Sequence, residues 1–110
     1  MNIQIFGKSK CFDTKKAERW FKERRIKYQY VDLPRYGIAR RELESVRAAV
    51  GAEALLDGKA KGAELVKYLA REEDRFEKLL EDPGLLRTPI VRNGKKATVG
   101  YAPEVWETWE

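Results

Sequence analysis

The start of the chain constrains the fold most, because it predicts a strand, a helix and a second strand in immediate succession. The apolar run at residues 2–6 is typical of a buried strand. Ala17, Trp20 and Phe21 then lie at helical spacing, which predicts a helix with one apolar face. Over residues 26–31, aromatic and β-branched residues alternate with polar ones, as in a strand. A strand, a helix and a second strand in this span form a βαβ unit, which predicts two parallel strands joined by a right-handed crossover.

The middle of the chain predicts mostly helix. We interpret residues 32–37 as a loop, because they break the preceding alternation. Apolar residues recur at helical spacing over residues 39–50, and Gly51 is well placed just past the end of that helix. Two further short helices are expected near residues 65–69 and 76–80.

The end of the chain predicts strands again. Two runs rich in β-branched residues, 89–92 and 95–99, flank the pair Asn93-Gly94. An Asn-Gly pair between two such runs is typical of a two-residue hairpin turn. Pro103 fits the first turn of a final helix.

This element order predicts an α/β fold. It reads β-α-β, then a helical insert at about residues 38–82, then β-β-α. That order is typical of a thioredoxin-like (glutaredoxin-like) domain with a mixed four-stranded sheet. At 110 residues we expect one domain, spanning residues 1–110, with a core that needs no disulfide or metal.

Composition excludes several other classes of protein. The chain has no histidine and a single cysteine, which excludes a zinc site of the usual kind and an internal disulfide. Its net charge is +5, but opposite charges are interleaved, which predicts solvated helix faces rather than a nucleic-acid surface. The polar start and the lack of a long apolar run predict neither a signal peptide nor a membrane span. With its free thiol, we expect a cytoplasmic protein.

Cys11 is the candidate nucleophile. It falls where the first strand turns into the first helix, and the N–H groups and dipole of a helix N-terminus favour a thiolate. Lys8 and Lys10 add positive charge nearby, and Asp13 can cap the helix. Thr14 can donate a hydrogen bond to the sulfur or merely cap the helix, but it cannot resolve a mixed disulfide. The alternative for Cys11 is a small buried apolar residue.

A second candidate segment is Arg87-Thr88-Pro89. Pro89 opens a predicted strand. A cis Thr88–Pro89 bond would leave the Thr88 backbone free to pair with a thiol peptide, whereas the alternative is an ordinary trans proline. Lys59 and Arg87 could bind an anionic substrate, or could be solvated surface charges.

Three stretches together resemble the arsenate reductase (ArsC/Spx) family, nearest to its uncharacterised glutaredoxin-like members. They are Cys11 after a short strand, residues 81–91, and Val99-Gly100-Tyr101. The resemblance implies a thioredoxin-like fold with a cis proline at Pro89. It also implies one of three activities: glutaredoxin-dependent arsenate reduction, glutathione-dependent thiol reduction, or regulation of transcription by binding RNA polymerase.

Departures from the family pattern narrow these expectations. Thr88 occupies the position before the proline, where family members usually have a basic residue. Lys59 falls near the position at which the arsenate reductases of the family have an arginine in the insert. Thr14 occupies the position of the second cysteine that the regulators often have. We therefore expect a glutathione-dependent thiol–disulfide oxidoreductase that uses Cys11, with a partner-binding regulator and an arsenate reductase as alternatives. Glutathione or another small thiol would be co-substrate, a glutaredoxin or another protein could be a partner, and no cofactor would be bound. The expected site comprises catalytic Cys11, Thr14 and Arg87, and substrate-binding Lys8, Lys10, Lys59, Thr88 and Pro89.

Overall fold

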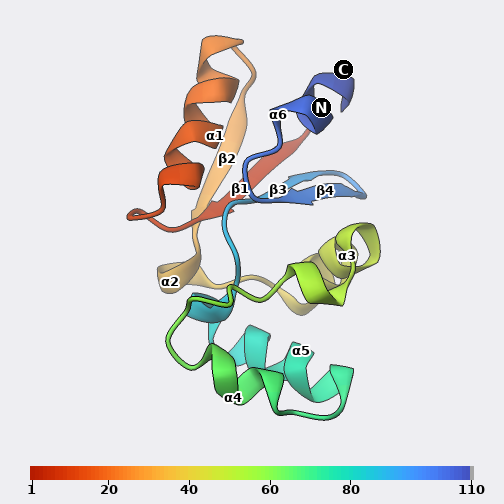
Figure 1. Cartoon of the computed structure of the whole chain (residues 1–110). Helices are drawn as coiled ribbons and strands as arrows, with labels where there is room; N and C mark the ends of the chain where they lie inside the picture. Colours follow the sequence, from red (N-terminus) through yellow and green to blue (C-terminus); the bar gives the residue numbers. More distant parts are fainter. Residues whose placement is uncertain (110) are drawn as a thin grey trace.

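A computed structural model describes residues 1–109 and contains a mixed four-stranded sheet in the order β2-β1-β3-β4 (Figure 1). The strands are β1 (Ile3–Gly7), β2 (Tyr28–Asp32), β3 (Ile90–Asn93) and β4 (Lys96–Val99). β1 pairs in parallel with β2 and antiparallel with β3, which pairs antiparallel with β4. The predicted mixed sheet is confirmed.

Alternation along the strands sends side chains into two cores, one on each face of the sheet. Ile5 packs with α1 (Phe12–Glu23) and with the last turns, α6 (Pro103–Trp106) and η3 (Glu107–Trp109). Its neighbour Phe6 packs on the opposite face, among residues of the helical insert. The β1 side chains therefore tie the two helical layers to one sheet.

In the sequence, the helical insert connects β2 to β3, and it occupies the lower half of Figure 1. Its main helices are α3 (Arg40–Val50), α4 (Ala63–Lys67) and α5 (Glu72–Glu81), with a short η1 (Ala52–Ala54) and η2 (Pro83–Leu85) at its bends. None of the helices formed by residues 1–109 is both long enough and apolar enough to span a bilayer.

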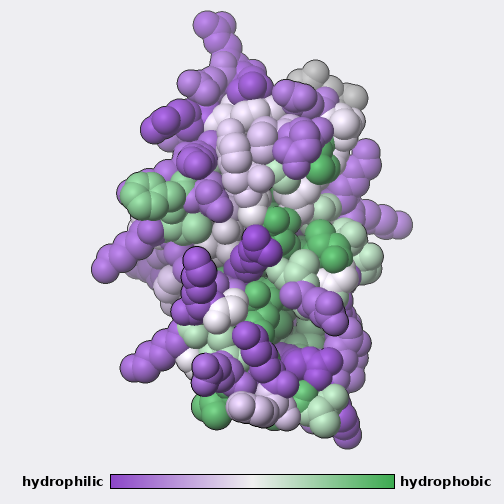
Figure 2. Space-filling view, viewed as in Figure 1, coloured by the Kyte–Doolittle hydropathy of each residue, from purple (hydrophilic) through white to green (hydrophobic). Residues whose placement is uncertain are grey.

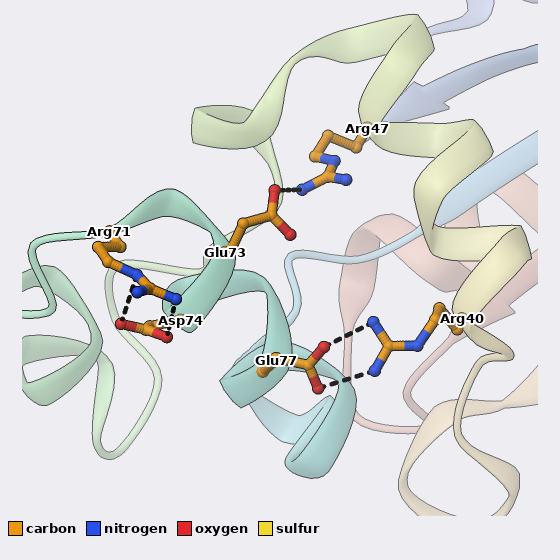
Figure 3. A network of polar contacts seen from close by, with 6 residues as sticks. All are labelled: Arg40, Arg47, Arg71, Glu73, Asp74 and Glu77. Carbon is orange, nitrogen blue, oxygen red and sulfur yellow. Dashed lines mark hydrogen bonds and ion pairs between the residues drawn. The ribbon is translucent and has the colours of Figure 1, made fainter.

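Exposed ion pairs link α5 to α3, as Figure 3 shows. Arg40 pairs with Glu77 at 2.6 Å, and Arg47 pairs with Glu73 at 3.3 Å. Exposed pairs contribute little stability each, so buried side chains hold most of the insert together. These include Leu43, Val46, Leu55, Val66, Phe76 and Leu79.

The local backbone structure differs from the sequence-based expectation in two segments. The segment interpreted as a loop contains a one-turn helix, α2 (Leu33–Tyr36), because Pro34 falls in its first turn, where a missing N–H costs nothing. In the hairpin, Asn93 pairs with Lys96, so the two-residue loop is Gly94-Lys95. Gly94 supplies the positive φ (63°) that the first loop position of a type II′ turn requires.

Candidate functional site

Cys11 lies where the strand–turn–helix pattern predicts it. It is the N-cap residue of α1, with extended backbone (φ −89°, ψ 118°), and its N–H donates to the Lys8 carbonyl at 3.0 Å. The thiol is partly exposed, so Cys11 is not a buried core residue. Asp13 falls inside the first turn and forms no capping hydrogen bond, so the predicted cap is wrong.

Thr88 and Pro89 meet Cys11 across a long separation in sequence. The Cys11 thiol donates to the Thr88 carbonyl with an Sγ···O distance of 3.7 Å. The Thr88–Pro89 peptide bond is cis, which agrees with the resemblance and excludes the trans alternative. Both residues are buried beside the start of β3.

Thr14 places a buried hydroxyl one helical turn beyond Cys11. Its side chain is 1% exposed, and Oγ1 has no hydrogen-bond partner within residues 1–109. Gly7 at the end of β1 makes room for it, because a Cβ added to Gly7 would lie 2.3 Å from Thr14 Cγ2. The glycine is required here by close packing rather than by a positive φ.

Opposing effects set the pKa of the Cys11 thiol. Burial, the largest effect, raises the pKa, but the hydroxyls of Thr14 and Thr88 and the N–H groups of Thr14 and Asp13 lower it, and the net pKa lies below its ordinary value. A protonated thiol donates to the Thr88 carbonyl, whereas a thiolate can only accept. The Thr14 hydroxyl, which has no partner beside the protonated thiol, can therefore donate a hydrogen bond to the thiolate and stabilise it.

The predicted basic residues do not gather around the sulfur. Lys8 is half-buried and donates from Nζ to the carbonyls of Gly84 and Leu86, at 2.8 and 2.9 Å. Lys10, Lys59 and Arg87 are exposed, and their side chains make no hydrogen bond or ion pair within residues 1–109. The principal groups that lower the thiol pKa are neutral donors, not these cations.

The sequence reasoning missed the support behind Thr88. The Arg87 N–H donates to the Leu55 carbonyl, and the Asp57 N–H donates to the Leu85 carbonyl, both at 2.8 Å. Residues 55–57 of the insert thus pair in antiparallel fashion with residues 85–87, the segment that leads to Thr88. Gly7 lies directly before residues 8–10, the reactive loop that leads to Cys11, and its missing side chain is the one local signal that the Thr14 side chain lies close by.

Other features of the surface lie away from Cys11. A cavity of about 360 Å³ lies between η1, α4 and α5, and Cys11 is not in its lining. Figure 2 shows apolar surface over this lower half of the molecule. Within residues 1–109, His, Cys, Asp and Glu side chains form no group of three that could hold a metal ion.

Comparison with known proteins finds similarity along nearly the whole chain. Residues 6–109 match the ArsC family. The global transcriptional regulator Spx 2 of Oceanobacillus iheyensis is 33% identical over 92% of this chain and 78% of its own. An ArsC family related protein from Bacteroides fragilis has the same fold over 100% of both chains (TM-score 0.86, 20% identity). The glutaredoxin-like NrdH-redoxin of Escherichia coli matches 100% of this chain and 96% of its own (TM-score 0.55, 14% identity). These structural likenesses confirm the expected thioredoxin-like fold.

Proposed function

This chain belongs to the ArsC family, and on that basis we propose that it is a thiol–disulfide oxidoreductase in which Cys11 is the nucleophile. Glutathione or another small thiol serves as co-substrate, which requires a reducing compartment. The observation that carries the proposal is the setting of the sulfur. Cys11 is partly exposed at the N-terminus of a 12-residue helix, and hydroxyl and N–H donors lower its pKa.

The proposed cycle has two exchange steps that balance. The Cys11 thiolate attacks one sulfur of a substrate disulfide, forming a mixed disulfide and releasing the other sulfur as a thiolate. A glutathione thiolate then attacks the substrate sulfur of that mixed disulfide, which regenerates the Cys11 thiolate. Because the chain has a single cysteine, the second thiol must come from outside. Thr14 donates to the thiolate of Cys11 before the attack and after release.

The neighbouring residues have limited roles in this proposal. The Thr88 hydroxyl donates to the Cys11 thiolate and, with Pro89, Thr88 shapes the surface on which the disulfide lies. Lys59 and Arg87 attract an anionic thiol from a distance, since their side chains are exposed. A charge held away from the sulfur affects association more than the chemical step.

Glutathione-coupled reduction of a small disulfide tests the proposal. Cys11→Ser should abolish turnover, whereas Ser9→Ala, a control in the same exposed loop, should retain it. Full activity of Cys11→Ser would overturn the proposal. Replacing the disulfide with arsenate in the same assay tests the arsenate reductase alternative.

A second candidate is a regulator that acts by binding a protein partner, and the observation that favours it is the 33% identity to Spx 2. The sequence resemblance implies RNA polymerase as that partner. Binding to purified RNA polymerase should then be equal for the wild type and Cys11→Ser. Reversal of an exposed charge on the insert, such as Lys67→Glu, should weaken it. Failure of the unmodified chain to bind would remove this candidate.

A further inference from the structure

Lys8 connects the reactive loop to the segment that carries Thr88. Its backbone carbonyl accepts from the Cys11 N–H at 3.0 Å. Its ammonium donates to the carbonyls of Gly84 and Leu86, at 2.8 and 2.9 Å, 76 and 78 residues further along the chain. Lys8 thus bonds both to Cys11 and to Leu86, which lies two residues before Thr88.

The two edges of the Thr88 segment are held differently. On the insert edge, backbone groups make the bonds: the Arg87 N–H donates to Leu55, and the Leu85 carbonyl accepts from Asp57. Leu86 has extended backbone (φ −76°, ψ 138°), and in an extended chain carbonyls alternate from one edge to the other.

The opposite edge faces the reactive loop. There the Leu86 carbonyl accepts from the Lys8 ammonium, and the Thr88 carbonyl accepts from the Cys11 thiol. No strand of residues 1–109 pairs with this edge, and a lysine side chain takes the place of a strand N–H. An ammonium has three donors, so one group satisfies two carbonyls.

We propose that Lys8 is a positioning residue whose ammonium holds the Thr88 segment against the reactive loop, so that Thr88 meets the Cys11 sulfur at the observed distance. Its effect on catalysis rests on the proposed oxidoreductase function, but its effect on the sulfur does not. We call the two hydrogen bonds from the Lys8 ammonium the tether. Without the tether, the Leu86 carbonyl loses its partner, and the segment that carries Thr88 is free to move away from Cys11. The Thr88 hydroxyl would then no longer help to stabilise the thiolate.

Lys8→Met tests the proposal, and Lys10→Met is the matched control. Both variants lose one positive charge from the same loop, but the Lys10 side chain bonds to no group within residues 1–109. Lys8→Met should slow alkylation of Cys11 near neutral pH by about threefold and move the pH midpoint of the reaction upward, because less of the thiol is ionised. Lys10→Met should react as the wild type does.

Salt separates a positioning effect from a charge effect. At roughly 1 M salt the Debye length is only about 3 Å, which screens a charge acting through space. The slower reaction of Lys8→Met relative to wild type should persist in that salt. The proposal would be overturned if Lys8→Met reacted as fast as the wild type, if Lys10→Met slowed equally, or if salt removed the difference.

A measurement on the unmodified protein covers the case in which Lys8→Met does not fold. In ¹⁵N NMR, the Lys8 ammonium should exchange slowly with water and show couplings across hydrogen bonds to the Gly84 and Leu86 carbonyl carbons. Exchange as fast as that of Lys10 would overturn the tether. Alkylation and NMR measurements do not depend on turnover. If the wild type did not reduce disulfides, the proposed function would be wrong, but this inference about Lys8 would still hold.

Discussion

Thr14→Val should make the Cys11 thiol less reactive and the folded protein more stable. Valine keeps the shape of threonine in a site that is 1% exposed, and it removes a hydroxyl that has no hydrogen-bond partner within residues 1–109. The two effects have opposite signs because the hydroxyl stabilises the thiolate but not the thiol. Few other substitutions would separate a role in reactivity from a role in folding so directly.

The expected rate follows from the energy of one hydrogen bond to a charged group. At the low end such a bond contributes about 1.5 kcal/mol, which corresponds to about a tenfold smaller thiolate fraction below the midpoint. The more basic thiolate is also more nucleophilic, with a Brønsted coefficient of about 0.4–0.5, which recovers about threefold. Alkylation of Cys11 by iodoacetamide below the midpoint should therefore slow by about three- to fourfold.

The expected stability follows from the cost of burying an idle hydroxyl. A buried polar group without a partner costs about 1–3 kcal/mol, so its replacement by a methyl group should raise the free energy of unfolding by about 1 kcal/mol. Denaturant unfolding at mildly acidic pH, where Cys11 is protonated, measures this gain.

Thr98→Val is the matched control, because it is the same change at another buried threonine. The Thr98 hydroxyl accepts from Trp106 Nε1 at 2.7 Å, so its loss should lower the free energy of unfolding by about 1–3 kcal/mol and leave the alkylation rate unchanged. The reasoning would be refuted if Thr14→Val reacted as fast as the wild type, or if it lost stability as Thr98→Val does.

Three further predictions concern packing and pH. Gly7→Ala should lower the free energy of unfolding by about 1–3 kcal/mol in denaturant titrations, because its Cβ would collide with Thr14. Burial and the Glu18 carboxylate raise the pKa of Tyr28 to about 12, so the wild type should lose stability above pH 10, as the unfolded chain ionises, and thermal melts of Tyr28→Phe should lose less. The lowered pKa of Cys11 has the opposite sign: the wild type should gain stability over Cys11→Ser as pH rises from the folded to the ordinary thiol pKa, and lose that gain on acidification.

Most elements of the fold could be predicted because their signals are local. Alternation around Tyr28 and helical spacing around Trp20 depend only on neighbours in sequence. The same reasoning failed where one residue fits two structures. Pro34 interrupts a strand, which indicated a loop, but it also suits the first turn of α2. Asn93-Gly94 indicated a hairpin, and the structure moves the loop one residue along to use Gly94 first.

The candidate site divides in the same way. Cys11 could be placed at a helix N-terminus from the strand–turn–helix pattern alone. The role of Lys8 could not be predicted, because its partners Gly84 and Leu86 are 76 and 78 residues away and are backbone carbonyls, which carry no sequence signal. In the sequence, a lysine near a cysteine suggests that its charge stabilises the thiolate. In the structure, the Lys8 ammonium instead donates to two backbone carbonyls.

The rate of Cys11 alkylation across pH, measured in the native protein and again in denaturant, tests the central claim most directly. The single cysteine makes the signal unambiguous. The structure predicts a native midpoint below that of the unfolded chain, which should lie near the ordinary value of about 8.5. A native midpoint at or above the unfolded one would contradict the account, since the donors around the sulfur would then not outweigh its burial.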